Sequence, residues 1–307
     1  MSGLAAGCRA AALALLLGTP GLADIAAVTS QNAGMLSLID TDGMRLIGSV
    51  PLPGKPAAVA VDGPRGRIMA ISVEDGRLHV LDLSGREQAA HGLGGAPFGL
   101  AVDPASGHAL VTDWGGALRE IDPADGRALR RWATGATPSG VAAGRGVIVT
   151  ADRDADSVTI IRPGGVVRVA VGHHPFGVTL RGGRAFVTNV LSDSVSVIDL
   201  EADRVVATIA TGERPYAVAF AAGRGFVTNQ YDASVTVFDE ASLSVLGRIE
   251  TDEYPEGIAA TADGNRILVA NWFSDTVQAI DPAGMAVVET LDMPEGPRAF
   301  GQFIGRP

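Results

Sequence analysis

The sequence predicts an all-β fold, a seven-bladed β-propeller whose four-stranded antiparallel blades form a closed ring. A motif of proline, any residue, a small residue and an apolar residue recurs seven times, at intervals of 37 to 42 residues. Each interval holds four short apolar runs, and the two chain ends hold the parts of one more set. A period near forty residues indicates a propeller or a solenoid. The motif prolines are Pro56, Pro97, Pro138, Pro175, Pro215, Pro255 and Pro297.

The first blade is expected to be assembled from both ends of the chain. Before the first motif there are three apolar runs, which begin at Ile25, Met35 and Leu46. After the last motif there is a single run, residues 298–304. Closing the ring removes the long sheet edge that an open array would expose. We therefore expect the C-terminal strand to pair with the N-terminal blade and complete it.

The unit that follows Pro215 shows the four strands expected in each complete blade. They are "AVAFA", "GFVTN" at 225–229, "SVTVFD" at 234–239 and "LSVLGRI" from Leu243. Val, Ile, Phe and Thr dominate these runs, and Gly, Asp or Asn separates them. No unit has the 3.6-residue apolar period of an amphipathic helix, which excludes helical solenoids.

The first 23 residues have the features of an export signal. An arginine supplies positive charge, Ala10 to Leu17 is a short apolar run, and a small-x-small sequence ends at Ala23. The run is shorter than the roughly 20 residues that span a bilayer. We expect residues 1–23 to be a cleaved signal peptide and residues 24–307 to form one propeller domain. The mature protein would then be periplasmic or secreted, with no membrane anchor.

Composition and charge exclude several classes of function. The chain has 307 residues, of which 47% are hydrophobic and 19% charged, with a net charge of −10. An acidic chain without a basic stripe repels phosphate backbones, so nucleic acid is not an expected partner. The single cysteine, Cys8, lies in the expected signal, so the mature chain has no thiolate nucleophile or thiolate metal ligand. We expect a monomer that binds a protein or a small molecule.

The second run of several units carries a specific sequence. It reads "FVTN" at 186–189 and at 226–229, and "LVAN" at 268–271. With "VSVID" and "VVATIATG" following, this pattern resembles the YVTN-repeat family of seven-bladed propellers, which are exported bacterial and archaeal proteins. The resemblance covers residues 25–304. It implies the fold but does not choose a function, because the wider superfamily includes binding modules, surface-layer proteins, subunits of amine dehydrogenases and a metal-dependent lyase.

Two repeated polar positions are expected to be structural. Six units end their third run in an aspartate before a tight turn, where the carboxylate can accept an Asx-type backbone hydrogen bond. The corresponding residue of the fourth unit is Arg162. At the Asn position we expect the side chain to satisfy backbone groups of the following loop. The aspartates are Asp40, Asp82, Asp122, Asp199, Asp239 and Asp281. The Asn position reads Ser30, Ser72, Asp113, Ala151, Asn189, Asn229 and Asn271.

The candidate binding residues cluster on one expected face. In a four-stranded blade, the loop that enters the inner strand and the loop between strands two and three lie on the same side. Eight of the 15 aromatic residues fall there, and such rings suit binding surfaces. They could equally plug the central hole. The predicted site residues are Lys55, Phe98, Trp114, His174, Phe176, Arg214, Tyr216, Tyr254, Trp272 and Arg298.

These residues favour a non-catalytic binding or interaction module with no cofactor, in which Lys55, Arg214 and Arg298 orient an anionic or polar ligand. One alternative is a metal-dependent lyase or hydrolase, because imidazole and carboxylate groups at the channel mouth could hold a divalent metal. Its candidate ligands are His174, Glu213, Glu253 and Glu256. Another alternative is a subunit that docks a periplasmic redox partner, with the acidic surface attracting a basic cytochrome. Serine-hydrolase, zinc-protease and haem-attachment motifs are absent from the sequence.

Overall fold

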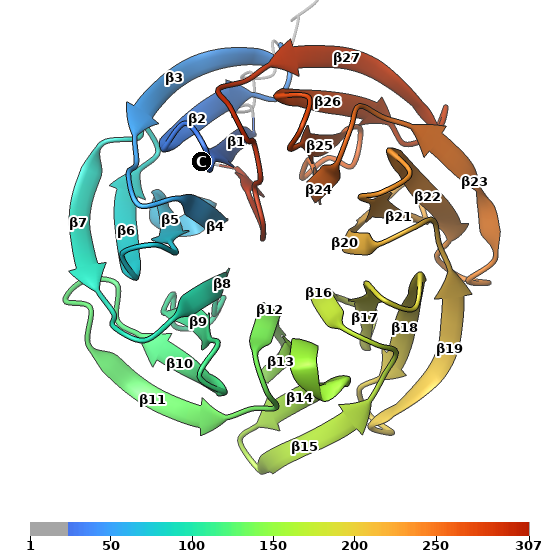
Figure 1. Ribbon diagram of the computed structural model, residues 1–307, viewed down its shortest axis with the longest axis horizontal. Helices are drawn as coiled ribbons and strands as arrows, with labels where there is room; N and C mark the ends of the chain where they lie inside the picture. The colour runs from blue at the N-terminus through green and yellow to red at the C-terminus, as the bar shows by residue number, and fades with distance from the viewer. Residues whose placement is uncertain (1–23, 307) are drawn as a thin grey trace, which may run out of the picture.

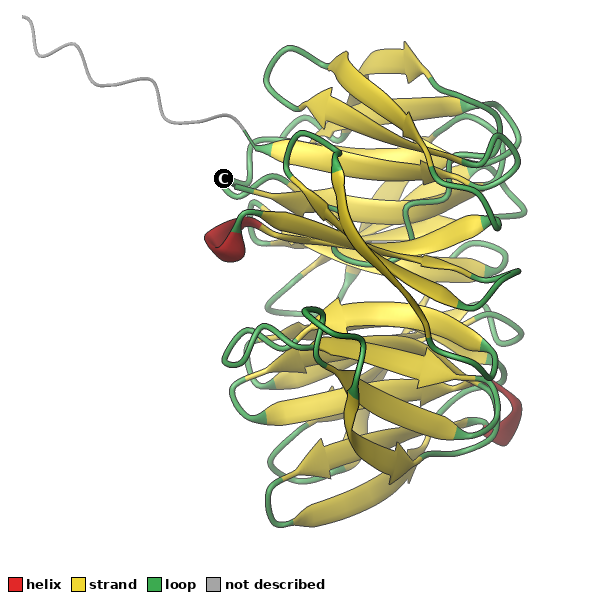
Figure 2. Cartoon of the chain, turned by 90° about the vertical axis from the view of Figure 1, so that its left-hand side faces the viewer, coloured by secondary structure: helices red, strands yellow, loops and turns green. Residues whose placement is uncertain are grey.

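The computed structural model describes residues 24–306, which form seven four-stranded antiparallel sheets around a central channel (Figure 1). The predicted all-β, seven-bladed architecture is confirmed. The predicted signal peptide and Cys8 lie outside the described residues. Seen edge-on, the strands run between two faces that carry the loops (Figure 2). Among residues 24–306, the structure contains no helix that is long and apolar enough to cross a membrane.

Each complete blade runs from an inner strand at the channel to an outer strand at the perimeter (Figure 1). The first three are β4 (Pro56–Asp62), β5 (Arg67–Ser72), β6 (Arg77–Asp82), β7 (Glu87–Gly92); β8 (Pro97–Val102), β9 (Ala109–Asp113), β10 (Ala117–Ile121), β11 (Ala128–Ala133); and β12 (Pro138–Gly144), β13 (Val147–Asp152), β14 (Ser157–Arg162), β15 (Gly165–Ala170). The next three are β16 (Pro175–Arg181), β17 (Arg184–Asn189), β18 (Ser194–Asp199), β19 (Arg204–Ala210); β20 (Pro215–Ala221), β21 (Arg224–Asn229), β22 (Ser234–Asp239), β23 (Val245–Glu250); and β24 (Pro255–Ala260), β25 (Ile267–Asn271), β26 (Thr276–Asp281), β27 (Ala286–Asp292).

The seventh blade closes the ring with both ends of the described chain. Its strand order is β28 (Ile304–Gly305), β1 (Ile25–Ser30), β2 (Met35–Asp40) and β3 (Arg45–Pro51). β28 pairs antiparallel with β1, with Ile304 opposite Ala26. The prediction that the C-terminal strand completes the N-terminal blade is confirmed.

The C-terminal run is less regular than the single strand expected over residues 298–304. An isolated bridge joins Pro297 to Ser30, and the next pairing joins Ile304 to Ala26. Between these two pairings the C-terminal segment advances by seven residues, from 297 to 304, whereas β1 spans only four, from 30 to 26. The three extra residues let the segment 299–302 leave β1 and cross to the next blade. There the amide of Val59 on β4 donates to the carbonyl of Phe300, at 2.9 Å.

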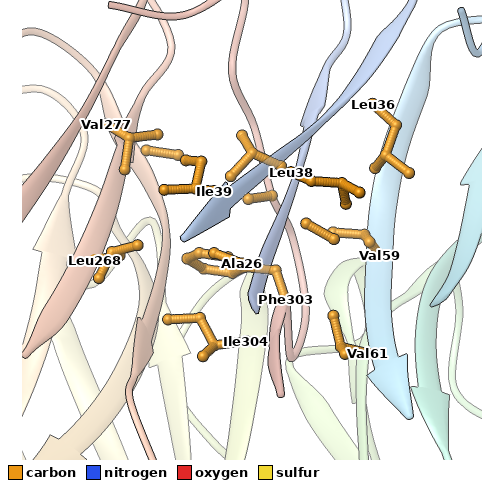
Figure 3. Packing of buried hydrophobic residues seen from close by; sticks show 14 of the residues in the cluster. Ala26, Leu36, Leu38, Ile39, Val59, Val61, Leu268, Val277, Phe303 and Ile304 are labelled. Atoms are coloured by element: carbon orange, nitrogen blue, oxygen red, sulfur yellow. The ribbon is translucent and has the colours of Figure 1, made fainter. Parts of the chain in front are cut away.

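The closure is held by apolar packing as well as by hydrogen bonds. Phe303 is fully buried among residues of three blades, including Ala26 on β1, Val59 on β4 and Leu268 on β25 (Figure 3). Burying a phenylalanine side chain contributes roughly 1.5–3 kcal/mol. The tail therefore acts as part of the core of its own blade and of both neighbouring blades.

Burial explains why the middle strands are continuous apolar runs. β17 and β18 lie between neighbouring blades and are buried along almost their whole length. The outer strand β19 alternates exposed and half-buried residues, as expected of a strand with one solvated face. The segment "FVTN" on β17 is continuously buried because both faces of that strand are covered, whereas "VVATIA" on β19 alternates because one face of that strand is exposed to solvent.

The six repeated aspartates form the predicted turns. In each, the side-chain Oδ1 accepts a hydrogen bond from the backbone amide two residues later, at 2.9–3.2 Å. Arg162, which replaces the aspartate in the fourth unit, instead reaches the neighbouring blade and pairs with Asp203. The Asx interpretation is confirmed at all six positions.

The interpretation of the Asn position needs two corrections. Pro138 pairs with Asp152, so Asp152 and not Ala151 occupies this position in the fourth unit. The amide nitrogen of Asn229 donates to side-chain hydroxyls of the third strand, Ser234 at 2.9 Å and Thr236 at 2.9 Å, and not to the loop backbone. The position is structural, but its partners lie on the adjacent strand.

Candidate functional site

The two kinds of loop expected to share a face do so, and backbone hydrogen bonds tie them together. The amide of Trp114 donates to the carbonyl of Ala96, at 3.0 Å, and the amide of Trp272 donates to the carbonyl of Tyr254, at 2.9 Å. We call this side of the ring the mouth face. The described chain ends, Asp24 and Arg306, lie on the opposite face.

Most residues that precede the motif prolines have left-handed backbone conformations. His174 has φ of 56°, and Arg214 has φ of 57°. This region is unfavourable for residues with a Cβ atom, by roughly 1–2 kcal/mol. The hydrogen bonds from the loop between strands two and three help to hold it. The same conformation occurs at Lys55, Thr137, His174, Arg214, Tyr254 and Gly296.

In the six complete blades, a bulge after the motif proline turns one side chain into the channel. The pairing of β8 with β9 shifts between Pro97 and Leu100, so Phe98 and Gly99 have no direct partner. An added Cβ on Gly99 would collide with the carbonyl of Ser139 in the next blade. The small residue of the motif therefore permits close approach of the blades, and the variable residue before it faces the channel.

Three rings from these positions close the channel together with a ring from the C-terminal segment, and we call the four the channel plug: Phe98, Phe176, Tyr216 and Phe300. Phe176 lies 4.5 Å from Tyr216 and 5.6 Å from Phe98 between ring centroids. Phe300 lies 5.2–5.7 Å from the other three rings. All four side chains are buried. Three of the ten predicted site residues thus form a plug, together with a fourth ring that the sequence analysis did not select.

A polar network lies beside the plug. The Nε atom of Arg298 is 2.9 Å from a carboxylate oxygen of Glu256, and its Nη2 donates to the hydroxyl of Tyr216 at 2.7 Å. Its Nη1 donates to Gln31 Oε1 at 3.0 Å. Gln230 donates to the other oxygen of Glu256 at 2.8 Å. Glu256 is 4% exposed at its side chain and Arg298 is 18% exposed, so only the arginine reaches the surface.

Burial shifts the pKa values of this network. It raises the pKa of the Glu256 carboxyl, and Arg298 offsets part of that effect. Burial also raises the pKa of the Tyr216 hydroxyl. For Arg298, burial lowers the pKa, but Glu256 and Tyr216 outweigh it, so the pKa is raised. Arg298 is therefore a permanently charged group at the channel mouth.

A pocket of about 350 Å³ opens above the plug on the mouth face. We call it the mouth pocket. Trp114 forms one wall, 39% exposed, and stacks on Phe98 with centroids 4.7 Å apart. The guanidinium of Arg153 lies 4.8 Å from the ring centre of Trp114. The lining residues are Gln31, Val73, Ala96, Pro97, Phe98, Trp114, Arg153, Phe176 and Arg298.

A second cavity, of about 330 Å³, lies in the channel beyond the plug. Inner-strand backbone and small aliphatic side chains dominate its lining, and Arg181 is its one charged side chain among the described residues. Arg181 already forms two hydrogen bonds to Glu240, at 2.7 and 3.1 Å. This cavity therefore has few groups that could orient a ligand.

Four other rings form a cluster at the edge of the mouth face, which we call the rim cluster: Tyr231, Tyr254, Trp272 and Phe273. Tyr254 is central, with centroids 4.7 Å from Phe273, 5.5 Å from Tyr231 and 5.8 Å from Trp272. Tyr231 and Phe273 are 58% and 59% exposed. Burial, together with Tyr231, raises the pKa of Tyr254 to about 12. The hydroxyl stays neutral and the cluster is an uncharged surface.

The remaining predicted site residues lie on the rim without converging. Lys55 is exposed. Arg214 lies 5.3 Å from the ring centre of Tyr231. His174 is half-buried, and burial, followed by the charge of Arg153, lowers its pKa. The predicted set therefore divides into the plug, the mouth pocket and the rim.

The candidate metal ligands are separated in the same way. Glu256 is buried against Arg298, whereas Glu213 and Glu253 are exposed on different rim loops. Across residues 24–306, no three histidine, cysteine, aspartate or glutamate side chains form a group that could hold a metal ion.

Three contributors to the site were not among the predicted residues. Phe300 lies in a segment expected to be a regular strand, and the crossing that brings it into the channel has no local sequence signal. Gln31 and Arg153 stand in the loops between strands two and three, which the repeat places on the mouth face, but neither residue is among the ten predicted site residues. Their roles depend on contacts with Arg298 and Trp114 from other blades.

The fold and its mouth face define the class of protein: the chain is a seven-bladed β-propeller. Comparisons with protein-family models and with curated protein sequences gave no match. Among solved structures, a functionally unknown protein from Desulfotomaculum acetoxidans is similar, with a TM-score of 0.75 and 14% identity. The similarity covers 89% of this chain and 98% of that chain.

Two enzymes share the architecture. Hydrazine synthase of Kuenenia stuttgartiensis has a TM-score of 0.71 and 16% identity, with 81% of this chain and 90% of that chain covered. The dihydro-heme d1 dehydrogenase NirN has a TM-score of 0.67 and 19% identity; the match covers 87% of this chain and 63% of that chain. At such identities the comparisons establish the fold alone.

Proposed function

We propose that the chain is an exported, non-catalytic binding module of the YVTN-repeat family that works through its mouth face. The single observation that carries the proposal is the mouth pocket, an open cavity of about 350 Å³ beside an exposed tryptophan. Small-molecule sites are concave, largely apolar and equipped with a few polar groups. Phe98, Trp114 and Phe176 supply the apolar lining, and Gln31 and Arg298 supply polar groups.

The repeat and the N-terminus support the family and the export. The "FVTN" segments lie on buried second strands, where the threonine and asparagine make the contacts that hold the blades. Export is testable directly. When the full chain is produced in a Gram-negative host, the protein in the periplasmic fraction should have an intact mass that begins at Asp24. A product that retains residues 1–23 in the cytoplasm would contradict it.

The binding function is tested by identifying any small molecule that remains bound to the purified protein. The protein is purified under native conditions and denatured, and the released small molecules are identified by mass spectrometry. We expect a molecule that is retained by the Leu246→Ala control, which alters an exposed apolar side chain on β23, and lost from Trp114→Ala. Equal release from both variants would refute the mouth pocket as the site.

The non-catalytic assignment has its own test. Stoichiometric divalent metal in the native protein, lost on His174→Ala, would favour the metal-dependent lyase or hydrolase and overturn the assignment. Elemental analysis of both proteins decides this without a known substrate.

A further inference from the structure

Among residues 24–306, the lining of the mouth pocket contains two guanidinium groups and no carboxylate. Arg153 pairs with Asp154, at 2.9 Å, and Arg298 pairs with Glu256, at 2.9 Å. Both counter-ions lie outside the lining. A ligand in the pocket therefore meets the positive members of these pairs, while the negative members stabilise the arginines from behind.

Not all N–H groups of Arg298 have an acceptor within residues 24–306. A guanidinium has five N–H groups. Nε–H faces Glu256 and Tyr216, one Nη2–H is donated to Tyr216, and one Nη1–H is donated to Gln31. Within the described chain these contacts account for three of the five. The remaining two lie one on each terminal nitrogen, and a guanidinium binds a carboxylate in bidentate fashion through N–H groups on two of its nitrogens.

Apart from Gln31 and the two arginines, the side chains that line the pocket are apolar or aromatic. Phe98 and Phe176 form the floor, and Trp114 and Pro97 are part of the wall. Aromatic surfaces favour offset-stacked or edge-on contacts with another ring. The volume of about 350 Å³ lies near the lower end of the range for small-molecule sites, so it suits a body of one or two rings.

We propose that the mouth pocket binds a small aromatic carboxylate, whose carboxylate is held by the two remaining N–H groups of Arg298 and whose ring lies against Trp114 and Phe98. The proposal rests on the binding function of the mouth face and adds the chemical class of its ligand. Arg153 contributes attraction, and Gln31 keeps the guanidinium of Arg298 oriented. The acidic net charge of the chain does not oppose this, because local groups decide the field inside a pocket.

Calorimetric titration with matched probes tests the class of ligand. The acids are phenylacetate and indole-3-acetate, and each is compared with its neutral amide and with the corresponding amine, phenethylamine or tryptamine. We expect the acids to bind, the amides to bind at least about tenfold more weakly, and the amines to show no binding. A bidentate charge-assisted pair is about twice as strong as neutral hydrogen bonds, which is why the amides should lose affinity.

Variants identify the groups responsible. Arg298→Lys keeps a positive charge beside Glu256 but removes the planar fork, so acid affinity should fall about tenfold. Arg153→Gln should weaken the acids a few-fold. Trp114→Ala should weaken acids and amides alike. Arg131→Gln, at an exposed arginine on the outer strand β11, is the matched control and should leave all affinities unchanged.

The outcomes separate this inference from the function on which it rests. Equal affinity for acids and amides would overturn the carboxylate assignment, and so would acid binding that survives Arg298→Lys. If binding of the acids is nevertheless lost in Trp114→Ala, the mouth pocket remains a binding site, but for a class of ligand other than carboxylates. If no acid binds, the inference is wrong, and release of native ligand from the wild type but not from Trp114→Ala still decides the proposed function. The amide comparison stands even if Arg298→Lys fails to fold.

Discussion

In four blades, a single threonine on the second strand joins the blade to the next one. The hydroxyl of Thr188 donates to the carbonyl of Tyr216 in the following blade, at 3.0 Å, and accepts a hydrogen bond from the amide of Gly177 in its own blade, at 2.9 Å. Thr228 repeats the arrangement with Glu256 and Ala217. The hydroxyl satisfies two backbone groups that the bulge leaves outside the strand pairing. This is the physical reason for the threonine in "FVTN".

Replacing such a threonine tests its role. Thr228→Val keeps the shape of the side chain but leaves the carbonyl of Glu256 and the amide of Ala217 without this partner. We expect the free energy of unfolding to fall by about 1–3 kcal/mol, the cost of leaving buried polar groups unsatisfied. Urea unfolding measures it. The control is Thr208→Val on the outer strand β19, where the side chain is exposed. Equal effects of the two substitutions would contradict the explanation.

The lowered pKa of Asp82, one of the Asx aspartates, predicts a loss of stability in acid. Hydrogen bonds from Ser84, then Arg86, lower the pKa of Asp82 from 3.8 to about 2. A carboxyl whose pKa is lower in the folded state contributes stability above its unfolded pKa, and this contribution disappears as the pH falls through the folded value. The relevant window therefore lies between about pH 4 and pH 2.

Asp82→Asn should reduce this pH dependence. The amide oxygen can still accept the turn hydrogen bonds, but the group no longer titrates. Urea unfolding of the wild type and the variant is compared at several pH values between about 5 and 2. The wild type should lose more stability across the window than the variant. Asp42→Asn, at an exposed neighbour of the Asp40 turn, should follow the wild type, and an identical slope for all three proteins would refute the assignment.

The separation of two residues along the chain determines whether their contact could be predicted from the sequence. An Asx turn joins groups two residues apart, so the repeated aspartate was sufficient evidence. The partners of Asn229 are five and seven residues away on the next strand, and finding them required the register. Gln31 and Arg298 meet across 267 positions. No local pattern indicates such a pair, although both residues stood in loops assigned to the correct face.

At the scale of the element, the C-terminal segment differs most from its prediction. The apolar pattern of residues 298–304 matches that of the other strands and predicts one continuous strand. In the structure, the segment leaves β1 and donates or accepts hydrogen bonds with β4 before it returns. The departure is possible because the channel has room for Phe300 inside the ring. There Phe300 packs against rings from three other blades, so the local sequence could not reveal its position.

Gly301 permits this crossing and provides a test of it. Its φ of 121° is unfavourable for any residue with a side chain, and an added Cβ would lie 2.5 Å from the carbonyl oxygen of Val59. We expect Gly301→Ala to lower the free energy of unfolding by about 1–3 kcal/mol. Thermal and urea unfolding measure it.

The matched control is Gly92→Ala at the end of β7, where an added methyl group meets nothing within 4 Å. It should change stability by less than about 0.5 kcal/mol. If Gly301→Ala were as stable as this control, residues 299–302 would not hold the crossing conformation between β1 and β4.

At the scale of the whole molecule, the ring could be predicted because repetition carries the information. Seven motif prolines set the number of blades, and three runs before Pro56 with one after Pro297 set the closure. The mouth face followed from the order of strands. Its division into a plug, a pocket and a rim did not, because that depends on how deeply each side chain reaches. Tyr216 and Arg298 both directly follow a motif proline, yet the tyrosine is buried in the channel plug and the arginine lines the mouth pocket.

Ring closure predicts that the position of the chain ends can be moved. Asp24 and Arg306 are adjacent, with the arginine Nε atom 2.8 Å from the carboxylate. A linker of about four Gly and Ser residues can therefore join them. New ends can be placed between Pro163 and Gly164, at the exposed turn between β14 and β15, where an added Cβ on Gly164 would meet nothing within 4 Å. In this permutant the chain begins at β15 and ends at β14, so the pairing of these two strands closes the ring in place of the pairing of β1 with β28.

The permutant should fold into the same ring. One long-range strand pairing becomes covalently connected and one local pairing becomes long-range, so the chain-entropy terms nearly cancel. We expect a free energy of unfolding within about 2 kcal/mol of the wild type, with the same radius of gyration by small-angle scattering. A second variant that lacks residues 297–307 should lose cooperative unfolding, because it removes Phe303 and the pairing with β1. A truncated chain that folds while the permutant does not would show that the tail does not close the ring.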